Sequence, residues 1–430
     1  MHELPARMTQ LQAQIRAGEV TAAQAAAAQC EKAQRVQSQY ACVAEEVSVP
    51  ALAEGPLQGI VLSHKDIFNL PGRTPGCGVG TGQAQSNTQA ADVIDRLQHA
   101  GASQWASLVM APFACGATSQ NADFPRCANP LDEHAVVGGS SSGSAVAVAA
   151  GMSYVALGTD TAGSVRIPAA TCGLLGLKTT AGWVSSEGCF PLAPSLDTVG
   201  LLARYAQDAR EVFQVIAPER TFEGADQHTR STSDMRCQVW WPDNLHAELK
   251  ETIAQWLKQV EVIGQIDLTD DVEKLSRYAQ CVLMFETAQT HRERLMSGSA
   301  PSGVQALGMT GLGVPQSWYQ QAISMRPALL KKFVDRYFQA SPFIVLPAFT
   351  QPVPDWCEVE AGNEQFDREQ LFSLHRWMGF VNYLGLPAIT FPVARDSRGR
   401  PVHVQVLGRP FSEHHLLDFA QRAESIFWIH

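Results

Sequence analysis

The sequence lacks the patterns that mark disulfide-rich, metal-binding and membrane proteins. Its ten cysteines are scattered along 430 residues without a Cys-x-x-Cys pair, so neither a disulfide framework nor a zinc knuckle is indicated. The sequence has no HExxH motif or clustered ligand spacing that would support metal catalysis. It has no apolar run as long as a membrane span, and no basic-then-apolar signal pattern begins it. We expect a cytoplasmic protein with reduced thiols, no cofactor and no membrane association.

Acidic residues outnumber basic residues in the sequence. Lys and Arg number 32 against 42 Asp and Glu, which gives a net charge of −10. Nucleic acids and anionic membranes both require a basic surface, so we expect no nucleic-acid partner. The chain has no internal repeat and no low-complexity linker, and 45% of its residues are hydrophobic. These features predict one large domain over residues 1–430 with an extensive buried core.

Alternating helical and strand-like patterns predict the fold class. Residues 4–38 are typical of two helices, with a capping box formed by Thr21 and Gln24, and an irregular stretch then extends to Pro56. Later patterns predict strands at 59–63, 105–110, 237–241, 343–346, 388–393 and 402–407, and helices at 90–100, 245–262, 270–297, 317–340, 368–385 and from 413. Strands separated by helices predict an α/β fold with a mixed, mostly parallel central sheet flanked by many helices.

Two glycine- and serine-rich segments are the most informative part of the chain. They are GGSSSGSAVAVAAG from Gly138 and GTDTAGSVRIPAATCGLLGLK from Gly158. The first leads directly into helix-forming residues, which gathers backbone N–H groups and hydroxyls where developing negative charge can be stabilised. In the second, small residues allow the backbone to approach a ligand closely. A flexible linker is the alternative, and the apolar flanks of both segments argue against it.

With these motifs, the sequence resembles the amidase signature family. The usual family motifs GGSSGGS, GTDTGGSIRxPA and VKD correspond here to GGSSSGS, GTDTAGSVRIPA and the HKD at 64–66. Ser140 and Ser164 are 24 positions apart, which matches the family spacing. Further similar segments follow in family order at 102–110, 116–121, 195–200 (SLDTVG) and in the C-terminal LGLPAITFPV and PVHVQVLGRPF. Only residues 205–340 and the stretch before Lys65 lack a clear match.

The resemblance implies an amidase signature fold and a Ser-Ser-Lys catalytic triad. In it Lys65 would be the general base, Ser140 the bridging serine on a cis peptide bond, and Ser164 the nucleophile of an acyl-enzyme. The backbone N–H groups of Thr161, Ala162, Gly163 and Ser164 would form the oxyanion hole. The chain would divide into a helical N-terminal segment (1–50), a signature core (about 56–204), a variable helical middle (about 205–340) and a C-terminal α/β part (341–430).

Elementary chemistry agrees with these roles. A serine hydroxyl is a poor nucleophile until a neighbour takes its proton. A lysine can do so only when neutral, which requires burial to lower its pKa from ~10.4 toward ~7–8. Lys65 follows an apolar strand, a position suited to burial, although a lone lysine is usually a solvated surface charge.

Other polar residues near the motifs have less specific roles. Ser140, Ser141, Ser142 and Ser144 are interchangeable by type, and the spacing alone selects Ser140. Ser141, Asp160 and Arg166 are expected to brace the loop, because charged groups beside a site need partners. Cys172 is expected to be a packing residue. The sequence gives His64 no reacting partner.

Three positions depart from the family pattern. Ala162 replaces a glycine in the oxyanion loop, which requires a negative φ there, and Ser142 replaces another glycine. His64 stands where an aliphatic residue is usual. We expect these changes to affect substrate shape and turnover more than the class of reaction.

The predicted activity is hydrolysis of a carboxamide or urea-type C–N bond, with a small-molecule amide as substrate. One alternative is an amidase subunit of a larger complex, like the glutamine-hydrolysing subunit of the aminoacyl-tRNA amidotransferase. A homo-oligomer or a small accessory subunit is compatible with the sequence. A second alternative is an α/β-hydrolase-type esterase, because Gly139–Gly143 fits G-x-S-x-G with Ser141 as nucleophile. His375, His403 and His414 are available to it, but none lies in a matching context.

Overall fold

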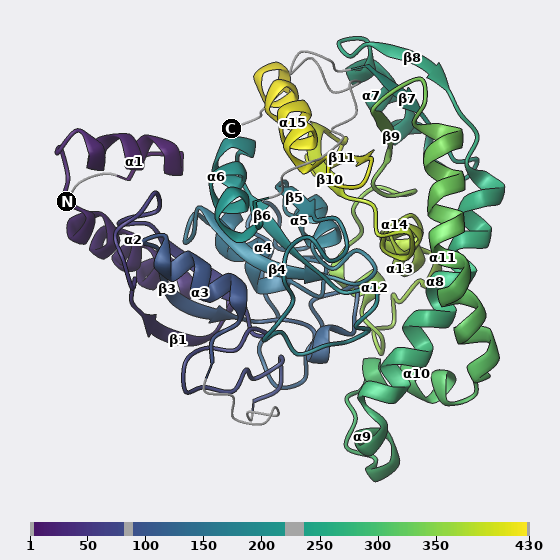
Figure 1. The fold of residues 1–430 in the computed structure, drawn as a ribbon, viewed down its shortest axis with the longest axis horizontal. Helices are drawn as coiled ribbons and strands as arrows, with labels where there is room; N and C mark the ends of the chain where they lie inside the picture. Colours follow the sequence, from purple (N-terminus) through teal and green to yellow (C-terminus); the bar gives the residue numbers. More distant parts are fainter. Residues whose placement is uncertain (1–3, 81–88, 220–235, 428–430) are drawn as a thin grey trace.

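The computed structural model describes residues 4–80, 89–219 and 236–427, and one 11-stranded sheet runs through the whole molecule (Figure 1). The strands occur in the order β1-β3-β2-β4-β6-β5-β10-β11-β9-β7-β8. Their bounds are β1 Val43–Val49, β2 Val61–Lys65, β3 Ser103–Leu108, β4 Val155–Asp160, β5 Leu175–Lys178, β6 Thr198–Ala203, β7 Cys237–Val239, β8 Val262–Gln265, β9 Phe343–Pro347, β10 Ala388–Arg395 and β11 Pro401–Gly408. The mixed sheet confirms the predicted α/β fold class.

Parallel pairing is less frequent in this sheet than the sequence patterns predict. Four neighbouring pairs are parallel (β2–β3, β2–β4, β7–β8 and β7–β9), and the other six are antiparallel. The reason lies in the connections. No helix separates β5 from β6 or β10 from β11, and both pairs are antiparallel, an arrangement that needs no crossover helix.

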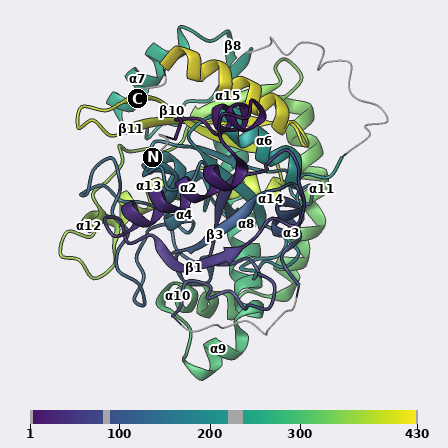
Figure 2. The same cartoon turned by 90° about the vertical axis from the view of Figure 1, so that its left-hand side faces the viewer.

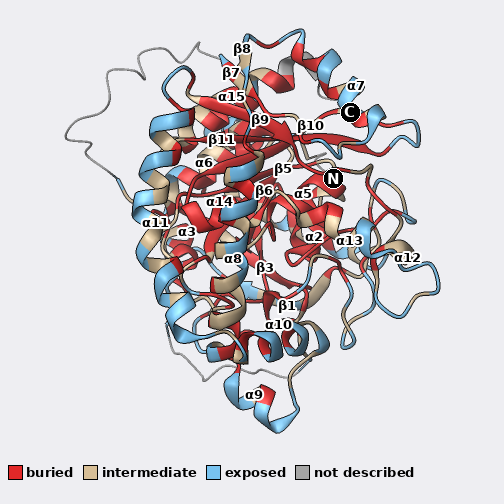
Figure 3. Cartoon of the chain, turned by 90° about the vertical axis from the view of Figure 1, so that its right-hand side faces the viewer, coloured by how far each residue is buried: buried red, intermediate tan, exposed pale blue. Residues whose placement is uncertain are grey.

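The helices cover the sheet on both sides and form a separate layer at one end. Their bounds are α1 Met8–Arg16, α2 Ala22–Gln37, α3 Asp92–His99, α4 Ser142–Ala149, α5 Arg166–Thr171, α6 Ala206–Ile216, α7 Ala247–Leu257, α8 Thr269–Thr290, α9 Arg292–Ser297, α10 Ser302–Leu312, α11 Gln316–Tyr337, α12 Trp356–Val359, α13 Arg368–His375, α14 Gly379–Leu384 and α15 Glu413–Phe427, with a 3₁₀ turn η1 at Pro112–Ala114. In Figure 1, α8, α10 and α11 line the right-hand side of the molecule. Figure 3 faces this layer and shows exposed residues on its outer surface.

Most predicted elements are present, although the predicted helix 270–297 is divided into α8 and α9, and α6, α10 and β8 were not predicted. The capping box at α2 is confirmed, because the Thr21 N–H donates to Gln24 Oε1 at 2.9 Å and the Gln24 N–H donates to Thr21 Oγ1 at 3.2 Å. The predicted helix 368–385 is divided into α13 and α14. The stretch expected to be irregular contains β1, which pairs with β3 at one end of the sheet (Figure 2). Its glutamates hide the strand pattern because they lie on the exposed surface of an edge strand.

The two helices that follow the serine motifs lie in the interior. All residues of α5 are buried, as are Ser142 to Val148 of α4. Small side chains make this possible: a Cβ on Gly143 would lie 2.5 Å from the Cys42 carbonyl oxygen and 2.7 Å from the Val109 backbone nitrogen. The two serine motifs, which include the first residues of α4 and α5, therefore lie in the interior of the molecule.

Within the described ranges 4–80, 89–219 and 236–427, no helix is both long enough and apolar enough to span a bilayer.

Candidate active site

Lys65 is a fully buried amine whose hydrogen-bond partners are hydroxyls and a carbonyl. It is the last residue of β2 and its exposed fraction is 0%. Its Nζ donates to Ser140 Oγ at 2.7 Å and to Thr159 Oγ1 at 2.8 Å, with the Thr159 carbonyl oxygen at 3.5 Å. No carboxylate lies within ion-pair distance of Nζ among the described residues.

Burial has a direct effect on the proton affinity of this amine. Desolvation lowers the pKa of Lys65 to about 7, although the negative charges of Asp197 and Asp160 act in the opposite direction. A lysine with this pKa exists partly as the neutral amine near neutral pH. It can therefore accept a proton from the hydroxyl it contacts.

Ser140 lies between Lys65 and the second serine motif. The peptide bond between Gly139 and Ser140 is cis, the feature that the family resemblance implies at this position. The Ser140 carbonyl accepts a hydrogen bond from the Ala111 N–H at 3.1 Å. The next residue joins the two motifs, because the Ser141 N–H donates to the Ser164 carbonyl at 3.1 Å. The Ser141 hydroxyl donates to the Thr159 carbonyl at 3.4 Å, a contact that fits a supporting role.

Ser164 lies in the turn between β4 and α5, and its exposed fraction is 8%. The structure joins Lys65 to Ser140 by a direct hydrogen bond, whereas it brings Ser164 near them through the backbone contact with Ser141. Among the described residues, no hydrogen bond links the hydroxyls of Ser140 and Ser164. Nor does the Ser164 hydroxyl form a side-chain hydrogen bond with any other residue that the structure describes.

The loop from Thr161 to Ser164 presents backbone N–H groups at the site. Those of Thr161, Ala162 and Ser164 have no acceptor among the described residues, as expected of oxyanion donors before substrate binds. The Gly163 N–H differs from the prediction, because it donates to Asp160 Oδ1 at 2.8 Å. Gly163 has a φ of +115°, and a Cβ there would lie 2.8 Å from Met378 Cγ. Ala162 is not among the residues with positive φ, so its methyl group is compatible with the loop.

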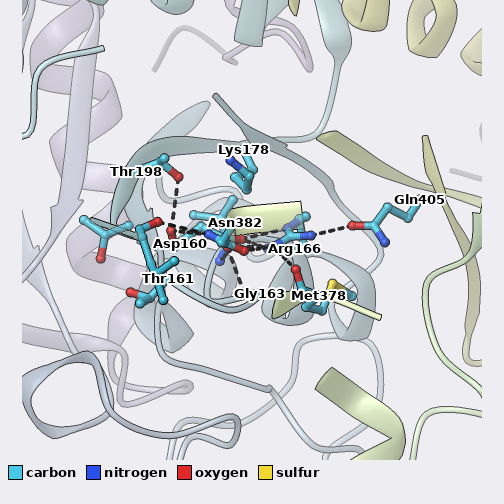
Figure 4. Close-up of polar contacts among 12 residues, drawn as sticks. Asp160, Thr161, Gly163, Arg166, Lys178, Thr198, Met378, Asn382 and Gln405 are labelled. Atoms are coloured by element: carbon cyan, nitrogen blue, oxygen red, sulfur yellow. Dashed lines mark hydrogen bonds and ion pairs between the residues drawn. The ribbon is translucent and has the colours of Figure 1, made fainter. Parts of the chain in front are cut away.

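A buried ion pair between Asp160 and Arg166 supports this loop (Figure 4). The guanidinium of Arg166 contacts both carboxylate oxygens of Asp160, with Nη2 2.8 Å from Oδ1 and Nε 3.0 Å from Oδ2, and both side chains are 0% exposed. Asp160 Oδ2 also accepts the backbone N–H groups of Val165 and Arg166 at 3.2 and 3.3 Å. Burial alone would raise the pKa of Asp160, but the charge and hydrogen bonds of Arg166, the charge of Lys178 and the Gly163 N–H hold it below its ordinary value. Asp160 and Arg166 thus have the bracing contacts expected of them.

Two residues from the C-terminal part complete the brace. Arg166 donates to Gln405 Oε1 at 2.5 Å and to Asn382 Oδ1 at 2.6 Å. The Asn382 amide in turn donates to the Asp160 carbonyl at 2.8 Å (Figure 4). Neither residue has a role that the sequence predicts. Both lie in or beside the C-terminal segments that resemble the family, and that resemblance was the available signal.

Asp197 is a further residue without a sequence-based role. It accepts the Thr161 hydroxyl on Oδ1 at 2.6 Å, and burial raises its pKa to about 6. It lines a small cavity, about 80 Å³ in volume, together with Thr159, the partner of Lys65. The remaining lining residues are Ile67, Ala114, Ser186, Cys189, Phe190, Pro191, Leu192, Pro194 and Thr198.

The other residues considered from the sequence lie outside this set of contacts. His64 is buried with Nδ1 3.3 Å from Gln104 Oε1, and burial lowers its pKa to about 4. Cys172 is buried in a hydrophobic cluster, and Ser142 is a buried residue in the first turn of α4. For the α/β-hydrolase alternative, Ser141 would need a histidine, but its hydroxyl contacts Thr159 instead. In the described part of the chain, no three His, Cys, Asp or Glu side chains converge as a metal site would require.

Comparison with known proteins identifies the family of the chain. The model of the Amidase family matches residues 7–417. A glutamyl-tRNA(Gln) amidotransferase subunit from Oleidesulfovibrio alaskensis is 31% identical over 86% of this chain and 84% of its own, and its counterpart from Halorhodospira halophila is 31% identical over 91% and 88%. A solved structure described as an amidase superposes with a TM-score of 0.85 at 25% identity, over 98% of this chain and 100% of its own. With a match that extends over nearly its whole length, the chain belongs to the amidase family.

Proposed function

We propose that this protein is an amidase that hydrolyses a carboxamide or urea-type C–N bond through an acyl-enzyme on Ser164. The observation that carries the proposal is the contact of 2.7 Å between Lys65 Nζ and Ser140 Oγ, inside a site where the lysine has no carboxylate partner among the described residues. A buried amine in this environment loses its proton readily and can act as a base near neutral pH.

The reaction begins with two proton transfers. Neutral Lys65 accepts the proton of Ser140, and Ser140 accepts that of Ser164 as Ser164 Oγ attacks the carbonyl carbon. The negative charge on the carbonyl oxygen is then stabilised by the backbone N–H groups of Thr161, Ala162 and Ser164. The second motif supplies both nucleophile and oxyanion donors, so the reacting carbon and its oxygen are held by one short loop.

The acyl-enzyme forms when the C–N bond breaks. The leaving nitrogen takes a proton from Ser140, which is replenished from the Lys65 ammonium, and departs as ammonia or an amine. Water then attacks the acyl carbon, and its proton passes through Ser140 to Lys65. As the acyl C–O bond breaks, this proton returns through Ser140 to Ser164 Oγ, which releases the acid and restores Ser164 and neutral Lys65. The whole cycle uses side chains and backbone groups of this chain.

Labelling with a fluorophosphonate tests the nucleophile directly. We expect the reagent to modify wild type at Ser164, as detected by intact-protein and peptide mass spectrometry. Ser164→Ala should remain unlabelled, whereas the matched control Ser141→Ala should still be labelled. Modification at Ser141 with Ser164 untouched would contradict the assignment and favour a nucleophile elbow.

One observation favours a second candidate, an amidase that works within a complex. Two relatives that are 31% identical are subunits of glutamyl-tRNA(Gln) amidotransferases. A panel of simple amides, scored by ammonia release from the purified chain, separates the two candidates. Release from the isolated chain would support an independent amidase, and labelling of Ser164 without release of ammonia from any amide would favour the complex.

A further inference from the structure

The hydroxyl of Thr161 ties the oxyanion loop to a carboxylate that comes from another part of the chain. Thr161 Oγ1 donates to Asp197 Oδ1 at 2.6 Å, a short contact between residues separated by 36 positions. Charge-assisted hydrogen bonds of this length are stronger than those between neutral groups. Thr161 is the first residue of the loop whose N–H groups face the reaction, so its position depends on where Asp197 lies.

Asp197 is itself held firmly in place. Its carboxylate accepts the backbone N–H groups of Leu192 at 2.9 Å and Ala193 at 3.1 Å. The neighbouring Ser195 is fixed by Glu286 of α8, which accepts both its N–H at 3.0 Å and its hydroxyl at 2.6 Å. The helical layer therefore anchors the segment that carries Asp197.

Asp197 also affects the amine of Lys65. Of the carboxylates near Lys65, Asp197 does most to raise the pKa of the amine, ahead of Asp160 on β4. The thiols of Cys189 and Cys77 also face it, but burial raises the pKa of both, so they are neutral where Lys65 titrates. Asp160 is paired with Arg166, whereas Asp197 accepts hydrogen bonds from a hydroxyl and backbone N–H groups only, among the described residues. Its negative charge is therefore not neutralised by a cationic partner.

We infer that Asp197 is a positioning residue with two effects on this site: it fixes the oxyanion loop through Thr161, and its carboxylate, which lines the same small cavity as the Lys65 partner Thr159, places a negative charge near the Lys65 amine. The inference rests on the proposed function, because it assigns Lys65 and the loop the roles given above. Asp197 makes no contact with the reacting atoms in this scheme and acts through its two neighbours.

The rate at which a fluorophosphonate labels Ser164, followed over a range of pH, tests both effects without knowledge of the substrate. In this reaction a bond forms between Ser164 Oγ and phosphorus, fluoride leaves, and the serine proton passes through Ser140 to Lys65. In wild type the rate should rise with pH along the ionisation of Lys65 (pKa about 7), which lies above that of Asp197 (pKa about 6). Asp197→Asn keeps the shape of the side chain but removes its charge, so the Lys65 ammonium loses a stabilising neighbour. We expect the ionisation to move to lower pH and the maximal rate to fall roughly tenfold.

Variants of Thr161 separate the two effects. Thr161→Val removes the hydroxyl but leaves the charge of Asp197, so the maximal rate should fall by a similar factor while the ionisation stays at the wild-type pH. Thr161→Ser, the matched control, should retain most of the wild-type rate. Equal rates in Thr161→Val and wild type would overturn the positioning effect even if Asp197→Asn failed to fold. A folded Asp197→Asn with the wild-type ionisation would overturn the effect on Lys65.

Lys65→Ala distinguishes failure of this inference from failure of the proposed function. If Lys65→Ala retains the wild-type rate and ionisation, or if wild type is not labelled at Ser164, the proposed function is wrong. If Lys65→Ala loses the ionisation while Asp197→Asn and Thr161→Val behave as wild type, the base is correctly assigned and the inference about Asp197 alone is wrong.

Discussion

Lys65 and Arg166 are two fully buried basic side chains in neighbouring parts of one site, yet their surroundings differ. Lys65 Nζ contacts two hydroxyls and a carbonyl, whereas the guanidinium of Arg166 contacts both oxygens of the Asp160 carboxylate. Burial lowers the pKa of Lys65 to about 7. Burial would also raise the pKa of the Asp160 carboxyl, but the positive charge of Arg166 outweighs this effect. The pKa of Asp160 therefore lies below its ordinary value.

The difference shows how one buried environment can contain both a base and a brace. Hydroxyls accept hydrogen bonds from an ammonium but do not cancel its charge, so the neutral form is favoured and proton transfer becomes possible. A bidentate carboxylate keeps its partner charged and fixes its orientation. We therefore expect substitution of Lys65 to affect the reaction and substitution of Arg166 to affect stability.

The strongest test of the comparison is removal of the base. Lys65→Ala should lower kcat by at least roughly a thousandfold, because no other group in the described structure contacts Ser140 as a proton acceptor. The rise of activity with pH should also disappear, since that ionisation belongs to Lys65 and its pKa lies below the usual value for lysine. Steady-state rates over a pH series, on an amide that the wild type hydrolyses, provide the measurement.

His64→Asn is the matched control for Lys65→Ala. The preceding histidine is also buried, but burial lowers its pKa to about 4 and its contact is with Gln104. The control should keep the pH dependence of wild type. A Lys65→Ala enzyme with the wild-type profile, alongside a His64→Asn enzyme without it, would reverse the assignment of the base.

Substitution of the brace should act mainly on stability. Arg166→Met leaves the Asp160 carboxylate buried without its cation, and breaking such a pair costs about 3–5 kcal/mol of the free energy of unfolding. Denaturant unfolding at neutral pH measures this loss. The deficit relative to wild type should shrink in acid, because the unpaired Asp160 can take up a proton.

Lys65→Met sharpens the contrast with Arg166→Met. An apolar side chain of similar length replaces a charge without a carboxylate partner, so the free energy of unfolding should be unchanged or raised by about 1 kcal/mol. A large loss of stability in Lys65→Met, equal to that of Arg166→Met, would show that the two basic residues do not differ in the way their contacts indicate.

The smallest effect is expected in the loop between these residues. Ala162→Gly should leave the protein folded and kcat/KM within about tenfold of wild type, because the loop contributes backbone N–H groups and Ala162 has no positive φ. Enzyme kinetics and the melting temperature together test this expectation. A loss of several hundredfold at an unchanged melting temperature would assign the methyl group a specific role.

The parts of the site that the sequence predicted are those with strong local patterns. Short motifs and their spacing point to Lys65, Ser140 and Ser164, whose catalytic roles stay a proposal, and the contacts between Asp160 and Arg166 lie within one motif. The partners Asn382 and Gln405 could not be paired with Arg166 from sequence, because they lie 216 and 239 positions away along the chain.

Contacts that depend on the helical layer could not be predicted from the sequence either. Glu286 lies in the region without a clear family match, and its contact with Ser195 spans 91 positions. Asp197 lies in a segment that resembles the family, but its role depends on a side-chain contact with Thr161 that no local pattern indicates. The hydrogen bond from the Gly163 N–H to Asp160 depends on the conformation of the loop, which the sequence motif does not specify.

The position of the C-terminal hairpin has a consequence for biosynthesis. Strands β10 and β11 lie between β5 and β9, so the two halves of the sheet are joined by strands that are synthesised after the other nine strands of the sheet. Until they emerge, Arg166 lacks both Asn382 and Gln405, and the loop that carries Ser164 lacks its rear support. A nascent chain therefore cannot complete the hydrogen bonds of Arg166 before β11 has been synthesised.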